Sequence, residues 1–225
     1  MQIKGNNNQV ANIGGSVNIS TPISGSLSQA IFGLQQPHIA PKEKTKVLYL
    51  SANPLNHTLR TDIDMSVVKN NLQKAKYREH IDIQYIPCAT IEHLSAAMLE
   101  FSPDIVHFSG HCQPNGLLLH DNNNNPTLIT GEQLLDILSL ANQTVKAVIL
   151  NACFSSQIGQ ILLSQIPIVI GMNNQIKDSS AIAFQQGFYQ GLGACNDITA
   201  AYKAALVALK LHNRADANTV QWLQQ

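Results

Sequence analysis

The sequence predicts an α/β fold, a three-layer sandwich in which a mostly parallel sheet lies between two layers of helices. Short apolar runs typical of buried strands recur along the chain, and stretches with helical spacing of apolar residues separate them. Parallel neighbours need crossover connections of this kind, so the alternation favours a parallel sheet. We expect this domain to span residues 46–225.

Apolar runs with little polar interruption predict strands that are buried on both faces. They occur, in chain order, at 46–50, 105–108, 147–150 and 166–170. Residues 81–86 alternate instead between apolar and polar side chains, as in a strand with one exposed face. Gly116 to His120 belongs to a further predicted strand pair around an Asn-rich turn.

Helices are expected between these strands, where apolar residues recur at spacings of three and four. The first, Thr61 to Tyr77, carries Ile63, Val67, Leu72 and Ala75 in this pattern. The others are expected at 90–100, 131–140, after Phe154, at 179–192 and at 196–212.

The composition excludes several classes of function. The formal net charge is zero, so no basic face is expected and nucleic acid is not an expected partner. No apolar run approaches the length of a membrane span and the N-terminus does not resemble a signal peptide, which predicts a cytoplasmic protein. The four cysteines have neither zinc-site spacing nor the density of a disulfide scaffold, so we expect reduced thiols, no metal and no cofactor.

Two predicted strands end in groups suited to acyl transfer. One runs out into Ser109-Gly110-His111 and the other into Asn151-Ala152-Cys153. The carboxyl ends of parallel strands meet at one edge of a sheet, so both side chains are expected to face one cleft. A histidine beside a thiol favours the nucleophilic thiolate and can later protonate the leaving amine. The alternative is a satisfied or capping histidine and a buried thiol at a strand end.

Several segments resemble the motifs of the CHAT family, bacterial relatives of caspases and separases. Asp104–His111 resembles the histidine motif and Leu150–Ser155 the cysteine motif. Shorter matches follow the family's order at 46–54, 74–78, 169–173, 178–184 and 187–189. The likeness covers residues 45–212 and implies a caspase-like peptidase domain, with Cys153 as nucleophile and His111 as general base and acid.

The oxyanion hole is expected at the backbone N–H groups of Gly110, Cys112 and Cys153. The CHAT family usually has glycine directly after the histidine, where this chain has Cys112. The amide N–H survives that change, but a side chain would crowd the substrate and would be strained if the backbone needed a positive φ.

The other candidates each have a structural alternative. Asp178 is either a pocket for a basic side chain before the scissile bond or the N-cap of the following helix. Asn151 is expected to satisfy backbone groups near the cysteine, and His107 to be a satisfied core histidine. The remaining histidines lack metal-ligand spacing and are expected at the surface, namely His57, His80, His93 and His120.

Residues 1–20 are rich in Asn, Gln and Gly, and isolated residues such as Val17 and Ile19 alternate with polar neighbours. Such a composition suits the stacking of identical strands, and it loosely resembles bacterial amyloid signalling motifs. The segment is either a β-prone self-assembly element or a flexible tail or edge strand. Residues 21–45, rich in Ser, Gly, Pro and Gln, are expected to be a linker.

Together these features predict a cysteine endopeptidase that cleaves a partner protein. Its expected role is that of a bacterial effector in antiviral defence or cell death, activated by homo-oligomer or filament formation through residues 1–20. The alternative is a catalytically silent caspase-like scaffold that polymerises and binds a partner. A small-molecule hydrolase using the same two residues is a third interpretation, which an enclosed apolar pocket would favour.

Overall fold

The computed structural model describes residues 43–54 and 61–225. The expected self-assembly segment at 1–20, most of the expected linker and His57 lie outside these described residues. All the described residues belong to the larger of two compact units of the chain, Lys42–Gln225.

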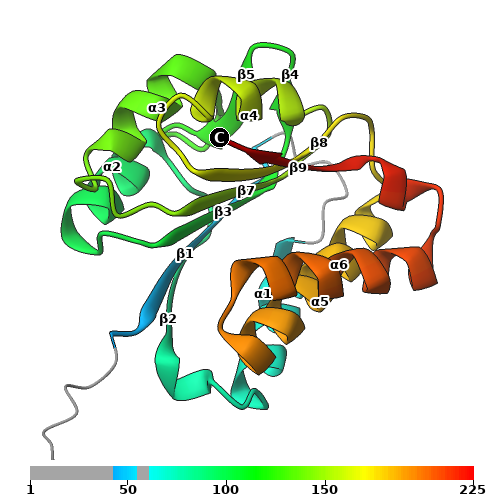
Figure 1. Cartoon of the computed structure of the whole chain (residues 1–225). Coiled ribbons are helices and arrows are strands. Elements are labelled where there is room, and N and C mark those ends of the chain that lie inside the picture. The colour runs from blue at the N-terminus through cyan, green and yellow to red at the C-terminus, as the bar shows by residue number, and fades with distance from the viewer. Residues whose placement is uncertain (1–42, 55–60) are drawn as a thin grey trace, which may run out of the picture. The chain divides into compact units, whose positions relative to one another are not determined.

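A six-stranded sheet of order β2-β1-β3-β7-β8-β9 forms the middle layer (Figure 1). Its first five strands are parallel, and β9 pairs antiparallel with β8 at the edge. The strands are β1 (Thr45–Ala52), β2 (Ile81–Ile86), β3 (Ile105–Gly110), β7 (Ala147–Asn151), β8 (Ile168–Met172) and β9 (Val220–Gln224). The predicted mostly parallel sheet is confirmed, whereas β9 was not anticipated.

A small antiparallel sheet of order β4-β5-β6 follows β3 directly. It consists of β4 (Cys112–Gln113), β5 (Gly116–His120) and β6 (Pro126–Thr130). The predicted strand pair around the Asn-rich turn corresponds to β5 and β6. This small sheet begins one residue after His111, so it is tied to the carboxyl end of β3.

Helices cover both faces of the large sheet (Figure 1). One face carries α1 (Thr61–Gln73), α5 (Asp178–Cys195) and α6 (Ile198–His212), and the other carries α2 (Ile91–Glu100), α3 (Gly131–Ser139) and α4 (Ser156–Leu162). Single-turn 3-10 helices occur at Arg78–His80 and Asp216–Asn218. The three-layer α/β architecture is the one that the sequence predicts.

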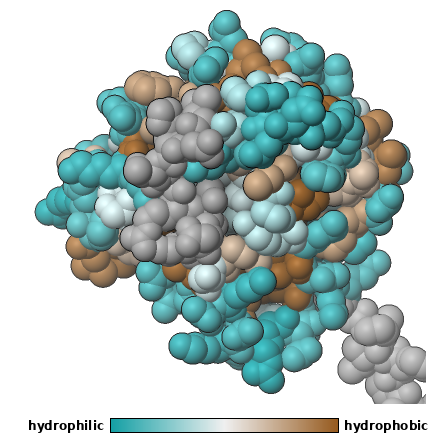
Figure 2. Space-filling view, turned by 180° about the vertical axis from the view of Figure 1, so that it is seen from behind, coloured by the Kyte–Doolittle hydropathy of each residue, from teal (hydrophilic) through white to brown (hydrophobic). Residues whose placement is uncertain are grey.

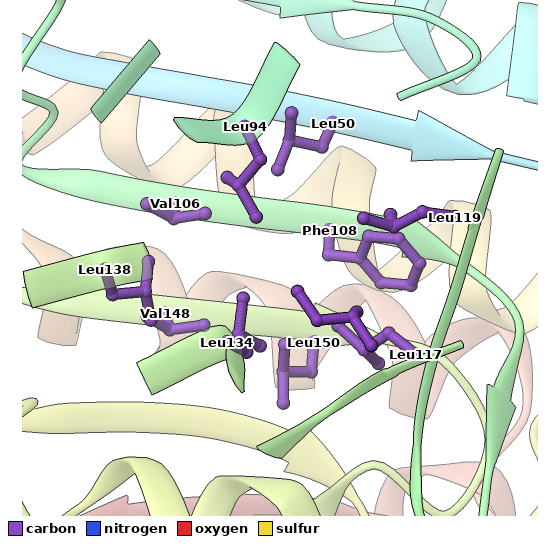
Figure 3. A pocket seen from close by; sticks show the side chains of 11 residues that line it. Leu50, Leu94, Val106, Phe108, Leu117, Leu119, Leu134, Leu138, Val148 and Leu150 are labelled. Carbon is purple, nitrogen blue, oxygen red and sulfur yellow. The ribbon is translucent and has the colours of Figure 1, made fainter. Parts of the chain in front are cut away.

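The alternation of side chains along the strands divides the core in two. In β3, Val106 and Phe108 pack toward α2 and α3, whereas Ile105 packs toward α1 and α5. Figure 3 shows apolar side chains from β1, β3, β5, β7, α2 and α3 converging on one point of the first core. The cavity enclosed there has a volume of about 10 Å³. It is barely large enough for one water molecule and is lined only by apolar side chains, so it is a packing void and not a substrate site.

Figure 2 shows one face on which hydrophobic residues form small groups separated by hydrophilic ones. Among the helices of the described residues, none is both long enough and apolar enough to cross a bilayer.

Candidate active site

Three neighbouring strands deliver the candidate residues to one edge of the sheet. In the parallel ladders Ala52 lies opposite Gly110, and Ser109 lies opposite Asn151. The chain therefore leaves β1, β3 and β7 at the same level. Asn53 follows β1, His111 follows β3 and Cys153 follows β7 by two residues. The histidine and cysteine segments therefore leave the sheet at the same edge, as the sequence predicts.

His111 is oriented by the side chain of Asn53. Its Nε2 lies 3.0 Å from Asn53 Oδ1. An amide oxygen only accepts hydrogen bonds, so Nε2 of the imidazole carries a proton and donates it to this bond. In the neutral ring the lone pair is then on Nδ1, the nitrogen that can act as a base. The same bond persists when the ring becomes an imidazolium.

The backbone around His111 is also fixed. A Cβ atom on Gly110 would lie 2.5 Å from the carbonyl oxygen of Ala52 and 2.7 Å from Cζ of Phe108, so only glycine fits there. The carbonyl of His111 accepts the N–H of Leu118 at 3.0 Å. The close contact with β1 on one side and the bond to β5 on the other set the direction in which the histidine leaves the sheet.

The loop that carries Cys153 is attached to β7 and to the segment after β8. Ser155 is fully buried, and its hydroxyl donates to the Leu150 carbonyl at 2.8 Å and accepts the Met172 N–H at 3.0 Å. Phe154 has a left-handed backbone with φ 58°, and its N–H donates to the Asn174 carbonyl at 3.3 Å. This conformation is unfavourable for a bulky residue, so the loop is held in it by these bonds.

The half-buried thiol of Cys153 lies against the segment before α5. Its Sγ is 3.8 Å from the carbonyl oxygen of Ile176. The side chain packs against the core on the α1, α5 and α6 side of the sheet. A thiol that is partly accessible and at the end of a strand is in a position to attack a bound substrate.

Cys112 does not have the strained conformation considered for the glycine position of the CHAT motif. The φ of Cys112 is not positive, so the backbone there tolerates a side chain. The side chain packs toward the core on the α2 and α3 side, whereas Cys153 packs on the opposite side. Burial, and secondarily the charge of a Cys153 thiolate, raise the pKa of Cys112 to about 11. Cys112 therefore remains a neutral thiol near pH 7.

Two other sequence-based interpretations are corrected or refined at α5 and β7. Asp178 is the first residue of α5 and not its N-cap, which is Lys177 without a capping side-chain bond. The Asp178 carboxylate still lies in the first turn of α5, where its negative charge interacts favourably with the positive end of the helix dipole. Asn151 is buried, and its Nδ2 lies 3.5 Å from the Ala181 carbonyl in α5, so its contact is not the local one expected.

The histidines outside the site divide into two groups. His107 is fully buried and its Nδ1 bonds the hydroxyl of Tyr189 at 3.0 Å, which confirms its assignment to the core. His93 is exposed and His80 is partly exposed, in line with the prediction. His120 is only 5% exposed, so its assignment to the surface was wrong. The small sheet folds His120 back against the end of β1, a contact that sequence spacing does not reveal.

Two residues that matter for the geometry were not singled out from the sequence. Asn53 follows the first strand of the sheet, so the same rule that selected His111 and Cys153 would have selected it. Ser155 appears in the sequence analysis only as the last residue of the cysteine motif. Its role is to hold the cysteine loop, and its position two residues after Cys153 gave no separate signal for that.

Known proteins share this fold. Among solved structures, a secreted C11 cysteine protease from Bacteroides thetaiotaomicron, bound to an irreversible peptide inhibitor, has a TM-score of 0.54 at 14% identity, over 73% of this chain and 58% of its own. The Arg-specific cysteine proteinase gingipain R has a TM-score of 0.55 at 12% identity, over 79% of this chain and 46% of its own. The sheet and its helices thus have the same fold as these two cysteine proteases.

Sequence comparison gives the family. A protein of Gillisia limnaea described as a probable protease is 22% identical over 173 residues, which are 74% of this chain and 31% of that protein. The chain thus spans about a third of the length of this relative. The CHAT domain family matches residues 44–222, which include both candidate strand ends and Asn53. This chain belongs to the CHAT domain family.

Proposed function

We propose that this protein is a cysteine endopeptidase in which Cys153 is the nucleophile and His111 is the general base and acid. The observation that carries the proposal is the Nε2–H to Oδ1 bond between His111 and Asn53, at the sheet edge shared with Cys153. This bond leaves Nδ1 of the neutral ring as the base. A histidine held in this orientation, at the same sheet edge as a cysteine, is suited to act as the base of a cysteine peptidase.

The reaction follows from these roles. Nδ1 of His111 takes the thiol proton, and the Cys153 thiolate attacks the peptide carbonyl carbon. The oxygen becomes an oxyanion that the N–H groups of Gly110, Cys112 and Cys153 are proposed to bind. Collapse of this intermediate breaks the C–N bond, and the imidazolium gives its proton to the leaving amine. His111 then takes a proton from water, and the hydroxide attacks the thioester carbon. The C–S bond breaks, the acyl group leaves as a carboxylic acid, and the imidazolium returns its proton to the Cys153 sulfur to restore the thiol.

A peptide substrate is supported by what two solved structures of this fold bind or cleave. One solved relative carries a peptide inhibitor, and another is Arg-specific. The enclosed apolar cavity of about 10 Å³ has no room for a small-molecule substrate. The small-molecule hydrolase, which an enclosed apolar pocket would favour, therefore has no support from this cavity.

We place the recognition of the residue before the scissile bond at Asp178. Ile176, two residues earlier, contacts the Cys153 sulfur through its carbonyl, so α5 begins beside the candidate nucleophile. A carboxylate at this position is suited to a lysine or arginine side chain of the substrate. The same residue at the first turn of α5 keeps its helix-stabilising effect, and the two roles are compatible.

The biological role that we propose is that of a defence or cell-death effector. Residues 1–20 would bring copies together, and the rise in local concentration would favour assembly of active domains. This part of the proposal depends on the composition of a segment outside the described residues. Electron micrographs of the full-length protein, compared with a version lacking residues 1–40, test it, and an unchanged appearance would contradict assembly through this segment.

Proteolysis is tested with candidate substrate proteins encoded beside the gene. Wild-type protein and Cys153→Ala are incubated with each candidate, and the products are analysed by mass spectrometry. We expect cleavage by the wild type alone. Equal cleavage by both would end the peptidase proposal, and binding of a candidate without cleavage by either would support the silent scaffold instead.

A further inference from the structure

A chain of hydrogen bonds continues from His111 past Asn53 into the small sheet. The backbone N–H of Asn53 donates to Nε2 of His120 at 3.1 Å. On the other side of the ring, Nδ1 of His120 lies 2.5 Å from Oδ1 of Asn124. His120 therefore touches the residue that orients His111 and also touches the turn between β5 and β6.

The partners of His120 determine its tautomer. A backbone N–H only donates, so Nε2 of His120 must accept and has no proton. The amide oxygen of Asn124 only accepts, so Nδ1 must carry the proton and donate it. Both bonds are satisfied by one neutral form of the ring. The opposite tautomer would set a donor against a donor at Asn53.

His120 is held firmly enough to position another residue. It is 5% exposed and pairs with Pro126 across the small sheet. Its backbone N–H donates to the Ala89 carbonyl at 2.9 Å, and the residue forms a parallel bridge with Thr90. The backbone of His120 is thus attached to β6 and to the segment before α2, and this fixes the position from which the ring contacts Asn53.

The turn that holds Nδ1 is itself ordered by Asp121. Oδ1 of Asp121 accepts the backbone N–H groups of Asn123 and Asn125 at 2.8 and 2.7 Å. Asn124 has a left-handed backbone with φ 67°, and its N–H donates to the Asp121 carbonyl at 3.0 Å. These bonds present the Asn124 side chain to His120.

We propose that His120 is a positioning residue for the catalytic histidine. By accepting the N–H of Asn53, it fixes the backbone from which Oδ1 of Asn53 receives the Nε2 proton of His111. This inference rests on the proposed function, because it assigns a role in orienting the base of the Cys153–His111 pair. It adds the small sheet, through its Asn124 turn, to the structure that supports the site.

Two amide substitutions of His120 distinguish the hydrogen bond at Nε2 from the hydrogen bond at Nδ1. In His120→Gln the amide oxygen can reach the former place of Nε2 and accept from Asn53, whereas in His120→Asn the shorter side chain reaches only the place of Nδ1. The readout is the rate at which iodoacetamide alkylates Cys153 in the full-length protein, followed by peptide mass spectrometry over a range of pH. Thermal unfolding of each variant identifies any general loss of structure.

We expect His120→Asn to slow alkylation of Cys153 by about 10-fold and to change its pH profile toward that of His111→Ala, by analogy with the loss of an outer hydrogen-bond partner of a metal-bound histidine. We expect His120→Gln to stay within about threefold of wild type, because it retains the acceptor. A merely structural role would affect both variants alike. Equal rates for the two variants, or a rate for His120→Asn equal to wild type, would overturn the proposal.

Asn124→Gly provides a variant that suits the backbone, since glycine adopts positive φ readily. It removes the acceptor for Nδ1–H, so the ring can take the opposite tautomer, and we expect alkylation to slow by about threefold. An unchanged rate would overturn the proposal if His120→Asn does not fold. If His111→Ala also leaves the alkylation rate of Cys153 unchanged, the proposed peptidase function fails. If His111→Ala slows alkylation but the His120 and Asn124 variants leave it unchanged, only the positioning role of His120 fails.

Discussion

The stability of the domain should fall steeply in mild acid because of His107. This residue is fully buried in β3, where its ring stacks on Tyr189 at a centroid distance of 5.5 Å and an interplanar angle of 5°. The ring centroid of Tyr49, on the neighbouring strand β1, lies 4.8 Å from that of His107. Nδ1 bonds the Tyr189 hydroxyl, and within the described residues the buried Nε2 has no hydrogen-bond partner. Burial lowers the pKa of His107 from 6.5 to about 3.

The sign and size follow from proton linkage. Between these two pKa values the unfolded chain binds a proton at His107 and the folded chain does not, so the free energy of unfolding decreases as the pH falls through this window. At about pH 4.5, two units below the unfolded pKa, the loss is about 3 kcal/mol. This is a large fraction of the stability of a typical domain.

The assay is urea unfolding at about pH 7.5 and pH 4.5, followed by the fluorescence of Trp222, the one tryptophan of the chain. Trp222 packs on Tyr202 at a centroid distance of 4.9 Å, so its signal should change on unfolding. His107→Asn is the matched control, because the amide can bond the Tyr189 hydroxyl and does not titrate. We expect wild type to lose about 3 kcal/mol more than His107→Asn between the two pH values. An equal loss in both proteins would refute the assignment of the effect to His107.

Three further outcomes concern the site. The free energy of unfolding of Phe154→Gly should exceed that of Phe154→Ala by about 1 kcal/mol, because φ at this position is 58°. The reverse order in thermal unfolding would contradict the left-handed conformation. Gly110→Ala should lower both the melting temperature and the alkylation rate of Cys153, because its Cβ would lie 2.5 Å from the Ala52 carbonyl oxygen, and wild-type values for both would contradict that close contact. Asp178→Asn should reduce cleavage after lysine or arginine by about 10-fold or more, and unchanged kcat/KM for such peptides would remove Asp178 from the pocket.

The periodic parts of the fold were predictable because each depends on local sequence. The strand 81–86 was predicted with the bounds of β2, and the helices were placed within a few residues of their observed ends. β9 was missed because Val220–Gln224 is short, partly polar and recognisable as a strand only once β8 offers an edge. The same reason applies to pairings between residues far apart in the sequence, which single-strand patterns do not specify.

The candidate site was predictable to the extent that it follows strand ends. His111 and Cys153 were found because buried strands stop just before them, and Asn53 obeys the same rule at β1. His120 could not be found in this way. Its burial results from the small sheet folding onto β1, and its contact with Asn53 joins positions that are 67 residues apart.

The pairing of Cys153 with His111 can be tested before any substrate is known. Iodoacetamide is added in limiting amounts to the full-length protein at neutral pH, and peptide mass spectrometry gives the alkylation rate of each of the four cysteines in wild type and in His111→Ala. We expect Cys153 to react much faster than Cys88, Cys112 and Cys195, and to lose this advantage in His111→Ala. A Cys153 that reacts no faster than exposed Cys88, or that is indifferent to the loss of the imidazole, would contradict the assignment of a catalytic pair.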